Sequence, residues 1–184
     1  MGEHTFTERA AALGPELRDR SEEIDSLRRL PPDLVDGLVE EGFFRFWVPQ
    51  AYGGAEISLL EGLETFMELA RHDTAVAWCS FIANTTALTA GLLEPRWAEE
   101  LFRPDGAIAG GFAAPVGRAR PVEGGLRVTG RWQWGSGTQH CTIIGGGVLL
   151  VDDDGAVAPR ADGLLAPFVL LDRDDVTFHD TWHV

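Results

Sequence analysis

The stretch "LVEEGFFRFWVPQAYGGAEISLLEGLETFMELARHDTAVAW", residues 38–78, decides the fold of this chain. Ser58 is followed three residues later by Glu61, which is the spacing of a capping box and predicts the start of a helix. An apolar stripe continues from that start, through Leu59, Leu60, Leu63, Phe66, Met67 and Ala70. Pro49 and the Gly53-Gly54 pair mark the preceding segment as a loop. The stretch therefore predicts helical packing around a Gly-Pro loop.

Upstream of this stretch, the sequence predicts two further helices. The first covers Thr7 to Arg29, with Gly14-Pro15 as the place where it would kink or split. The second covers residues 31–43, with Pro32 in its first turn and Gly42 as its stop.

Downstream, Asp73 or Thr74 is expected to cap a helix over residues 75–93. This segment is apolar nearly all round, which indicates a central position in a helical bundle. A short amphipathic helix from Pro95 to Phe102 closes the helical half.

From Ala107 onward the pattern becomes typical of strands. Residues 119–134 predict a hairpin that turns at Gly124-Gly125, with Trp132 and Trp134 on one face of its second strand. Further strands are expected at 141–151, 166–172 and 176–184, with a turn at 152–155. We therefore predict an α+β fold, with an N-terminal α-helical bundle domain over 1–104 and an antiparallel β-sheet or barrel domain over 105–184.

Composition excludes several classes of function. With 15 basic and 29 acidic residues, the chain has a formal net charge of −14, which disfavours nucleic acids and anionic membrane surfaces as partners. The apolar run Cys141 to Val151 contains three glycines and is too short to span a membrane, and the N-terminus lacks the order of a signal peptide. We expect a cytoplasmic location.

Metal and dinucleotide sites are not indicated either. Cys79 and Cys141 stand apart without a CxxC pattern, and no GxGxxG opens a helix. The histidines have no metal-ligand spacing, so we expect surface or packing roles for all five of them: His4, His72, His140, His179 and His183.

The quoted stretch, above all its "P-x-x-Y-G-G" loop at residues 49–54, resembles the N-terminal domain of the acyl-CoA dehydrogenase superfamily. The part from Ala107 resembles the middle β-domain of that family. Its members carry a further helical bundle after the β-domain, whereas this sequence ends at "DTWHV", residues 180–184. The resemblance therefore implies a chain truncated before that C-terminal bundle, with an incomplete β-domain.

The same resemblance assigns the cofactor site to residues 130–140, "GRWQWGSGTQH". Family members place a Trp beside the flavin ring and a Thr or Ser hydroxyl near flavin N5. Counting from Gly130, Trp134 and Ser136 take these places, with Gly135 allowing close backbone approach. An aromatic side chain next to a hydrogen-bond donor suits the apolar plane and polar edge of a flavin. Packing of both tryptophans on the helical half, with the serine in a turn, is the alternative.

A second flavin-holding loop of the family corresponds to Phe112, Ala113 and the residues after them. True acyl-CoA dehydrogenases carry Thr and Glu where this chain has Ala113 and Ala114, and the Gly-Ser-Asp that follows is absent. The phrasing "GGFAAPVGRARPVEGG", residues 110–125, instead resembles two-component flavin-dependent monooxygenases. The resemblance implies reduced FAD or FMN supplied by a separate flavin reductase, and transfer of one oxygen atom of O₂ to a small organic substrate.

Two residues receive roles under this interpretation. Ser136 is the candidate catalytic residue, donating the hydrogen bond that delays loss of hydrogen peroxide. Asn84 is the candidate substrate-binding residue, because hydroxylases of phenols tend to have a His near this point; an amide can hydrogen-bond there but cannot act as a base. Thr85 and Thr86 are expected to bond back to helix carbonyls instead.

Two other functions remain open at this point. One is an acyl-CoA dehydrogenase or oxidase, and the other is a catalytically incomplete remnant of the fold that could still assemble as a homo-oligomer.

Overall fold

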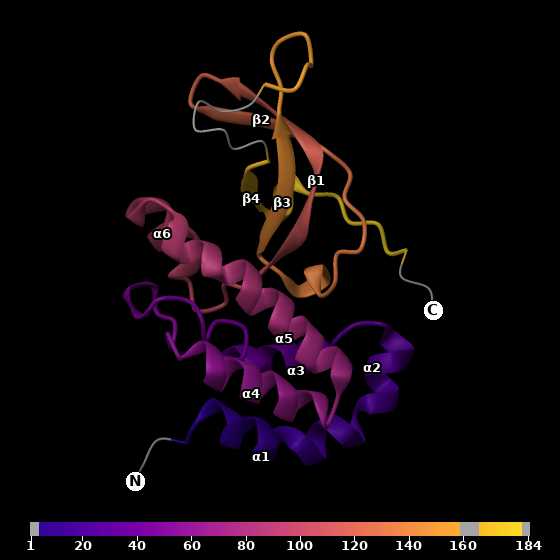
Figure 1. The fold of residues 1–184 in the computed structure, drawn as a ribbon. Helices are drawn as coiled ribbons and strands as arrows, with labels where there is room; N and C mark the ends of the chain where they lie inside the picture. The colour runs from indigo at the N-terminus through magenta and orange to yellow at the C-terminus, as the bar shows by residue number, and fades with distance from the viewer. Residues whose placement is uncertain (1–3, 159–165, 182–184) are drawn as a thin grey trace.

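Helices and strands are segregated along the chain, as the sequence predicts. The structure is a computed structural model that describes residues 4–158 and 166–181. Figure 1 shows the helices gathered in one half and the sheet in the other. The helices are α1 (Phe6–Asp19), α2 (Ser21–Leu27), α3 (Pro32–Glu40), α4 (Leu59–Ala70), α5 (Thr74–Ala87) and α6 (Pro95–Phe102). The strands are β1 (Ala109–Val122), β2 (Gly125–Thr129), β3 (Ile143–Leu150) and β4 (Phe168–Asp172).

The expected first helix is split, but at a different place. Pro15 lies inside α1, and the break between α1 and α2 falls at Arg20, whose φ is −97° and ψ 0°. The Arg20 guanidinium bonds to Glu23 at 2.9 Å and to Asp33 of α3 at 2.8 and 2.9 Å. A tertiary contact therefore marks the break, while Gly14-Pro15 does not split the helix.

Helix α4 begins where the capping pattern predicts, since the Ser58 hydroxyl accepts a hydrogen bond from the Glu61 N–H at 3.1 Å. Its apolar stripe is only partly covered. Phe66 is buried, whereas Leu59, Leu60, Leu63 and Met67 are 62%, 67%, 48% and 63% exposed. The helix buries Gly62, Thr65, Phe66 and Leu69 instead.

Helix α5 is central, as predicted. The Asp73 carboxylate caps it by accepting from the Val76 N–H at 2.9 Å. It packs on α4 and on β1, and a 3₁₀ turn, η2 (Leu88–Leu92), extends it. Among the described residues, the one helical span that is long and apolar enough to cross a membrane is Thr74–Leu92. Length and composition alone are weak evidence for a membrane span, because the core helix of a soluble protein passes the same test.

The sheet is mixed, which corrects the antiparallel prediction. Its strand order is β2-β1-β3-β4, with β1 and β3 parallel and the two other pairs antiparallel. The predicted hairpin joins β1 and β2, with Val122 opposite Gly125. β2 runs back only along the second half of β1, where Thr129 lies opposite Arg118. The segment 130–142 then returns the chain to the start of β1, so β3 begins beside Ala109 and runs in the same direction as β1. Hairpin signals do not reveal this crossover.

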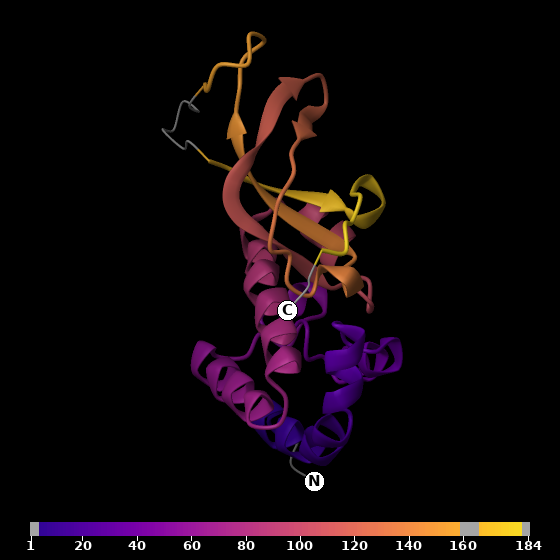
Figure 2. The ribbon, with the colours of Figure 1, turned by 90° about the vertical axis from the view of Figure 1, so that its right-hand side faces the viewer.

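The expected last strand does not form over its described part. Residues 176–181 have no strand partner in the described structure, and instead they run back from the sheet toward α2 (Figures 1 and 2). There the Asp180 carboxylate pairs with Arg28 at 3.5 Å and with Arg29 at 3.3 Å. The remaining predicted strand residues, including Trp182 and His183, lie outside the described residues.

The loop between α3 and α4 supplies much of the core. Phe43, Phe44 and Phe46 are at most 1% exposed, and the Phe46 ring lies 5.1 Å from that of Phe66. Arg45, between them, is also buried, and its Nη atoms donate to the carbonyl oxygens of Tyr52, Phe102, Pro104 and Asp105 at 2.7–3.2 Å. One guanidinium thus ties this loop to the end of α6 and to the segment that enters β1.

Replacing Arg45 by Met should lower the free energy of unfolding by roughly 3 kcal/mol or more, since each buried carbonyl left without a donor costs about 1–3 kcal/mol. Urea unfolding monitored by circular dichroism measures the change. Arg103 is the matched control: it is exposed and donates to the Ala51 carbonyl at 2.9 Å, so Arg103→Met should cost under about 1 kcal/mol. Equal losses for the two variants would contradict the role given to Arg45.

Candidate functional site

The two tryptophans of residues 130–140 have different environments, which corrects the prediction that they share one face of a strand. β2 ends at Thr129, and Trp134 adopts a left-handed φ of +65°. Trp132 turns inward and donates from Nε1 to the Gly147 carbonyl at 2.9 Å. Trp134 is 77% exposed.

The indole of Trp132 packs in a slot between glycines, where any larger residue would clash with it. A Cβ built at Gly117, Gly130 or Gly146 would lie 2.4, 2.5 or 3.0 Å from the indole of Trp132. The other side of the slot is Phe112 of β1, whose ring centroid lies 6.2 Å from that of Trp132 at an interplanar angle of 26°. Trp132 is therefore a packing residue that anchors the loop to the sheet.

Trp134, Gly135 and Ser136 follow this anchor as a tight turn. The Ser136 N–H donates to the Trp134 carbonyl at 2.9 Å, and a Cβ at Gly135 would lie 2.5 Å from the Phe112 ring. The structure thus brings four of the predicted cofactor residues together. Ala113 follows Phe112 on β1, exposed, where the pairing of β1 with β3 shifts register. Their contacts with flavin stay predictions.

A cavity of about 280 Å³ lies beside Ser136, between the turn, α2 and the start of α5. Its walls combine an exposed indole, apolar side chains, two arginines and the polar side chains of the turn. The lining residues are Ile24, Asp25, Arg28, Arg29, Leu30, Ala75, Trp78, Cys79, Gly135, Ser136, Gly137, Gln139 and His140. Within the described residues, the Ser136 hydroxyl has no hydrogen-bond partner.

His140 is a site residue that the sequence did not single out. It packs on Phe44 with ring centroids 5.2 Å apart. Burial, with a smaller contribution from the charge of Arg173, lowers its pKa to about 4, so the imidazole is neutral at pH 7. Its Nε2 and the Oε1 of Gln139 are buried, and neither has a partner in the described part of the chain. The prediction of a surface or packing role for His140 is thus incomplete.

Arg173, just after β4, holds the turn in place. Its Nη1 donates to the carbonyls of Thr138 and Cys141, each at 3.1 Å, and its guanidinium lies 4.5 Å from the centroid of the Phe178 ring. The 3₁₀ turn η3 (Thr138–His140) is therefore held by a residue that follows β4, more than 30 positions further along the chain.

Asn84, the predicted substrate-binding residue, is fully buried in α5. Its Nδ2 donates to the carbonyls of Phe43 and Ser80 at 2.8 and 2.9 Å, and its Oδ1 accepts from the Trp47 N–H at 3.2 Å. All three hydrogen bonds go to backbone, so the structure gives Asn84 a structural role in place of the predicted substrate contact. Thr85 bonds back to the Phe81 carbonyl at 2.8 Å, as expected.

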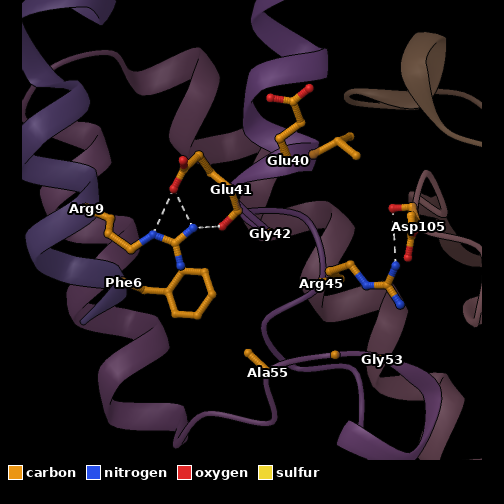
Figure 3. Close-up of a pocket in the computed structure, with 11 residues that line it drawn as sticks. Phe6, Arg9, Glu40, Glu41, Gly42, Arg45, Gly53, Ala55 and Asp105 are labelled. Atoms are coloured by element: carbon orange, nitrogen blue, oxygen red, sulfur yellow. Dashed lines mark hydrogen bonds and ion pairs between the residues drawn. The ribbon is translucent and has the colours of Figure 1, made fainter. Parts of the chain in front are cut away.

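A larger cavity, of about 550 Å³, is lined by the first turns of α1, the end of α3 and the loop at residues 53–55 (Figure 3). Both of its arginines already have protein partners. Arg9 of α1 donates from Nε to Glu41 at 2.9 Å, and Arg45 points toward Asp105, where Nη1 binds the backbone carbonyl at 3.2 Å. These contacts stabilise the fold, and the cavity holds none of the predicted site residues.

Thiol and metal chemistry find no support in the described residues. Burial raises the pKa of Cys79 to about 12 and also raises the pKa of Cys141, so neither thiol ionises at neutral pH. Both cysteines are free. No group of three His, Cys, Asp or Glu side chains capable of holding a metal ion occurs within residues 4–158 and 166–181.

Comparison with known proteins places this geometry in context. Residues 6–95 match the family described as acyl-CoA dehydrogenase, N-terminal domain. The chain is 30% identical to the flavin-dependent monooxygenase, oxygenase subunit HsaA, of Rhodococcus jostii, over 96% of this chain and 45% of that protein. The chain therefore spans less than half the length of this curated relative.

Two solved structures share the fold. The HsaA monooxygenase from M. tuberculosis superposes with a TM-score of 0.88 at 28% identity, over 98% of this chain and 46% of that one. XiaF from Streptomyces sp., in complex with FADH2 and glycerol, gives a TM-score of 0.88 at 28% identity, over 97% of this chain and 44% of that one.

The structural role of Asn84 predicts that Asn84→Ala lowers the free energy of unfolding by roughly 2–4 kcal/mol, because it removes the acceptor of the buried Trp47 N–H and one of the donors to the Phe43 carbonyl. Urea unfolding measures this change. In the control Thr85→Ala, the lost hydroxyl bonds only within its own helix, and the loss should stay within about 1 kcal/mol. A fully stable Asn84→Ala protein would show that the amide is not needed for packing.

The depressed pKa of His140 predicts a pH dependence of stability. The unfolded chain, with a His pKa near 6.5, binds more protons than the folded chain at pH values between about 6.5 and 4. The contribution is thus present above pH 6.5 and is lost as the pH falls to 4, by about 3 kcal/mol in all. Unfolding at a series of pH values should give a shallower dependence of the unfolding free energy on pH for His140→Phe than for the wild type. Parallel curves for wild type and His140→Phe would contradict this.

Proposed function

We propose that this chain, which belongs to the acyl-CoA dehydrogenase superfamily, is the helical and β part of the oxygenase component of a two-component flavin-dependent monooxygenase. One observation of the molecule carries the proposal. Among residues 4–158 and 166–181 the hydroxyl of Ser136 has no hydrogen-bond partner, and Ser136 lines a cavity two residues from the exposed indole of Trp134. The protein as a whole would then hydroxylate a small organic substrate.

The residues present fit a flavin. Trp134 offers an exposed aromatic surface, Ser136 a hydrogen-bond donor, and Phe112 an apolar neighbour that Gly135 approaches closely. These are the residues that would hold the ring. A reduced flavin, when bound, reacts with O₂ and supplies the oxygen atom for transfer. We favour FAD, because the related XiaF was solved with FADH2.

The chain's own residues would orient and protect this chemistry. Ser136 would donate a hydrogen bond to the flavin edge and so delay the loss of hydrogen peroxide. The packed pair of Phe112 and Trp132 would exclude water from the sheet side. His140, neutral at pH 7, carries one ring N–H and no positive charge there.

Acyl-CoA chemistry is disfavoured for two reasons. Ala113 and Ala114 are exposed methyl side chains, where the dehydrogenases carry Thr and Glu. The relatives of this chain are named as oxygenase components, which implies a partner reductase for those proteins. By analogy we propose a separate flavin reductase and a small-molecule substrate as partners, and we place the boundary between the two domains at residues 104 and 105.

A flavin titration of the 184-residue chain tests the proposal. We expect the reduced form to bind at least about tenfold more tightly than oxidised FAD, followed by fluorescence under anaerobic and aerobic conditions. Ser136→Ala should weaken binding of the reduced form by about tenfold, the value of one hydrogen bond to a polar edge. Ser26→Ala, on the exposed surface of α2, is the matched control.

Two results would count against the proposal. Tight binding of oxidised FAD, without preference for the reduced form, would favour a dehydrogenase. Unchanged binding in Ser136→Ala would remove this residue from the flavin site.

A further inference from the structure

Gln139 and His140 stand out in the cavity beside Ser136, because each leaves one buried polar atom without a hydrogen bond among the described residues. These atoms are Oε1 of Gln139 and Nε2 of His140. A buried polar group without a partner is destabilising, and folded proteins rarely leave one so. Both residues line the same cavity of about 280 Å³.

The turn that carries them is held from several sides, so the two side chains are presented in a fixed arrangement. Gly137 adopts a φ of +66°, and the Cys141 thiol donates to its carbonyl at 3.3 Å. Arg173 binds the carbonyls on either side of Gln139 and His140, at Thr138 and Cys141. A site held in this way needs little reorganisation when a ligand binds.

The hydrogen-bonding chemistry of Gln139 Oε1 and His140 Nε2 limits the kind of ligand that could bind to them. Oε1 of a glutamine only accepts hydrogen bonds, and a neutral imidazole carries no charge to attract an anion. A ligand group that satisfies Oε1 must therefore donate, as a hydroxyl or an N–H does, whereas a carboxylate has no hydrogen to donate to it. Apolar surface from Ile24, Leu30 and Trp78 forms part of the wall. Its two arginines, Arg28 and Arg29, both pair with Asp180, and Asp25 adds a second carboxylate beside them.

We propose that Gln139 and His140 form a recognition pair for an uncharged hydroxyl or N–H group on an otherwise apolar ligand. The inference rests on the proposed function in so far as that ligand is the substrate, which would then lie in the same cavity as Ser136. Gln139 and His140 hydrogen-bond to the hydroxyl or N–H group of the ligand, and Trp78 contacts its apolar part.

Three small probes test the pair on the 184-residue chain at pH 7. Benzyl alcohol carries a donor, benzyl methyl ether lacks it, and benzoate is an anion of similar size. Dissociation constants come from chemical-shift titrations by NMR, with the imidazole nitrogens of the histidines observed directly. We expect benzyl alcohol to bind about tenfold more tightly than the ether, with benzoate weakest, and to shift Nε2 of His140.

Variants locate the effect. His140→Phe keeps a ring packed on Phe44 and should abolish the preference for the alcohol, whereas the exposed control His179→Phe should keep it. Gln139→Leu changes a partly exposed position and should also reduce the preference for the alcohol. It provides the test if His140→Phe does not fold. Equal binding of alcohol and ether to the wild type, or an unchanged preference in either folded cavity variant, would overturn the inference.

The outcome is separable from that of the flavin titration. Discrimination between the probes without binding of reduced flavin would leave the recognition pair in place and remove the proposed function. Binding of reduced flavin without discrimination would do the reverse.

Discussion

Helix α5 holds the protein together, because it packs on α4 and on β1 and so connects the helical half with the sheet. Its position depends on the buried amide of Asn84, which binds the backbone of Phe43 and Trp47. An amide donates and accepts at the same time, so one side chain satisfies both a carbonyl and an N–H where water cannot reach. The start of the same helix supplies Trp78 and Cys79 to the cavity wall.

The two tryptophans of the candidate site have different roles: Trp132 is packed against the sheet, and Trp134 is exposed. Trp132 is fixed between glycines and donates to the Gly147 carbonyl, which ties the loop to the sheet. The residues after Trp132 do not continue the strand β2, which ends at Thr129. Trp134 has a left-handed φ, and its indole is exposed. Ser136 then reaches the cavity wall, and Arg173 holds the turn behind it.

Local signals in the sequence were enough to locate most elements. Ser58 and Asp73 mark helix starts through capping bonds to residues three positions away, and the Gly124-Gly125 hairpin depends on neighbouring residues. A prediction that rested on residue alternation alone, without a local hydrogen bond, was wrong. The predicted strand at 176–184 has alternating residues, yet its described part runs toward α2, where Asp180 meets two arginines.

The sequence by itself determined that helices precede strands along the chain, that helices begin after Ser58 and Asp73, and that a hairpin turns at Gly124-Gly125. Only the tertiary structure decided which apolar surface is covered, since α4 buries Phe66 but leaves Leu60 and Met67 exposed. It also decided that Asn84 is structural and that His140 is neutral. The physical reason is that burial and hydrogen bonding at these positions come from residues far away in the chain, such as Phe43 and Arg173, which periodicity and capping patterns do not register.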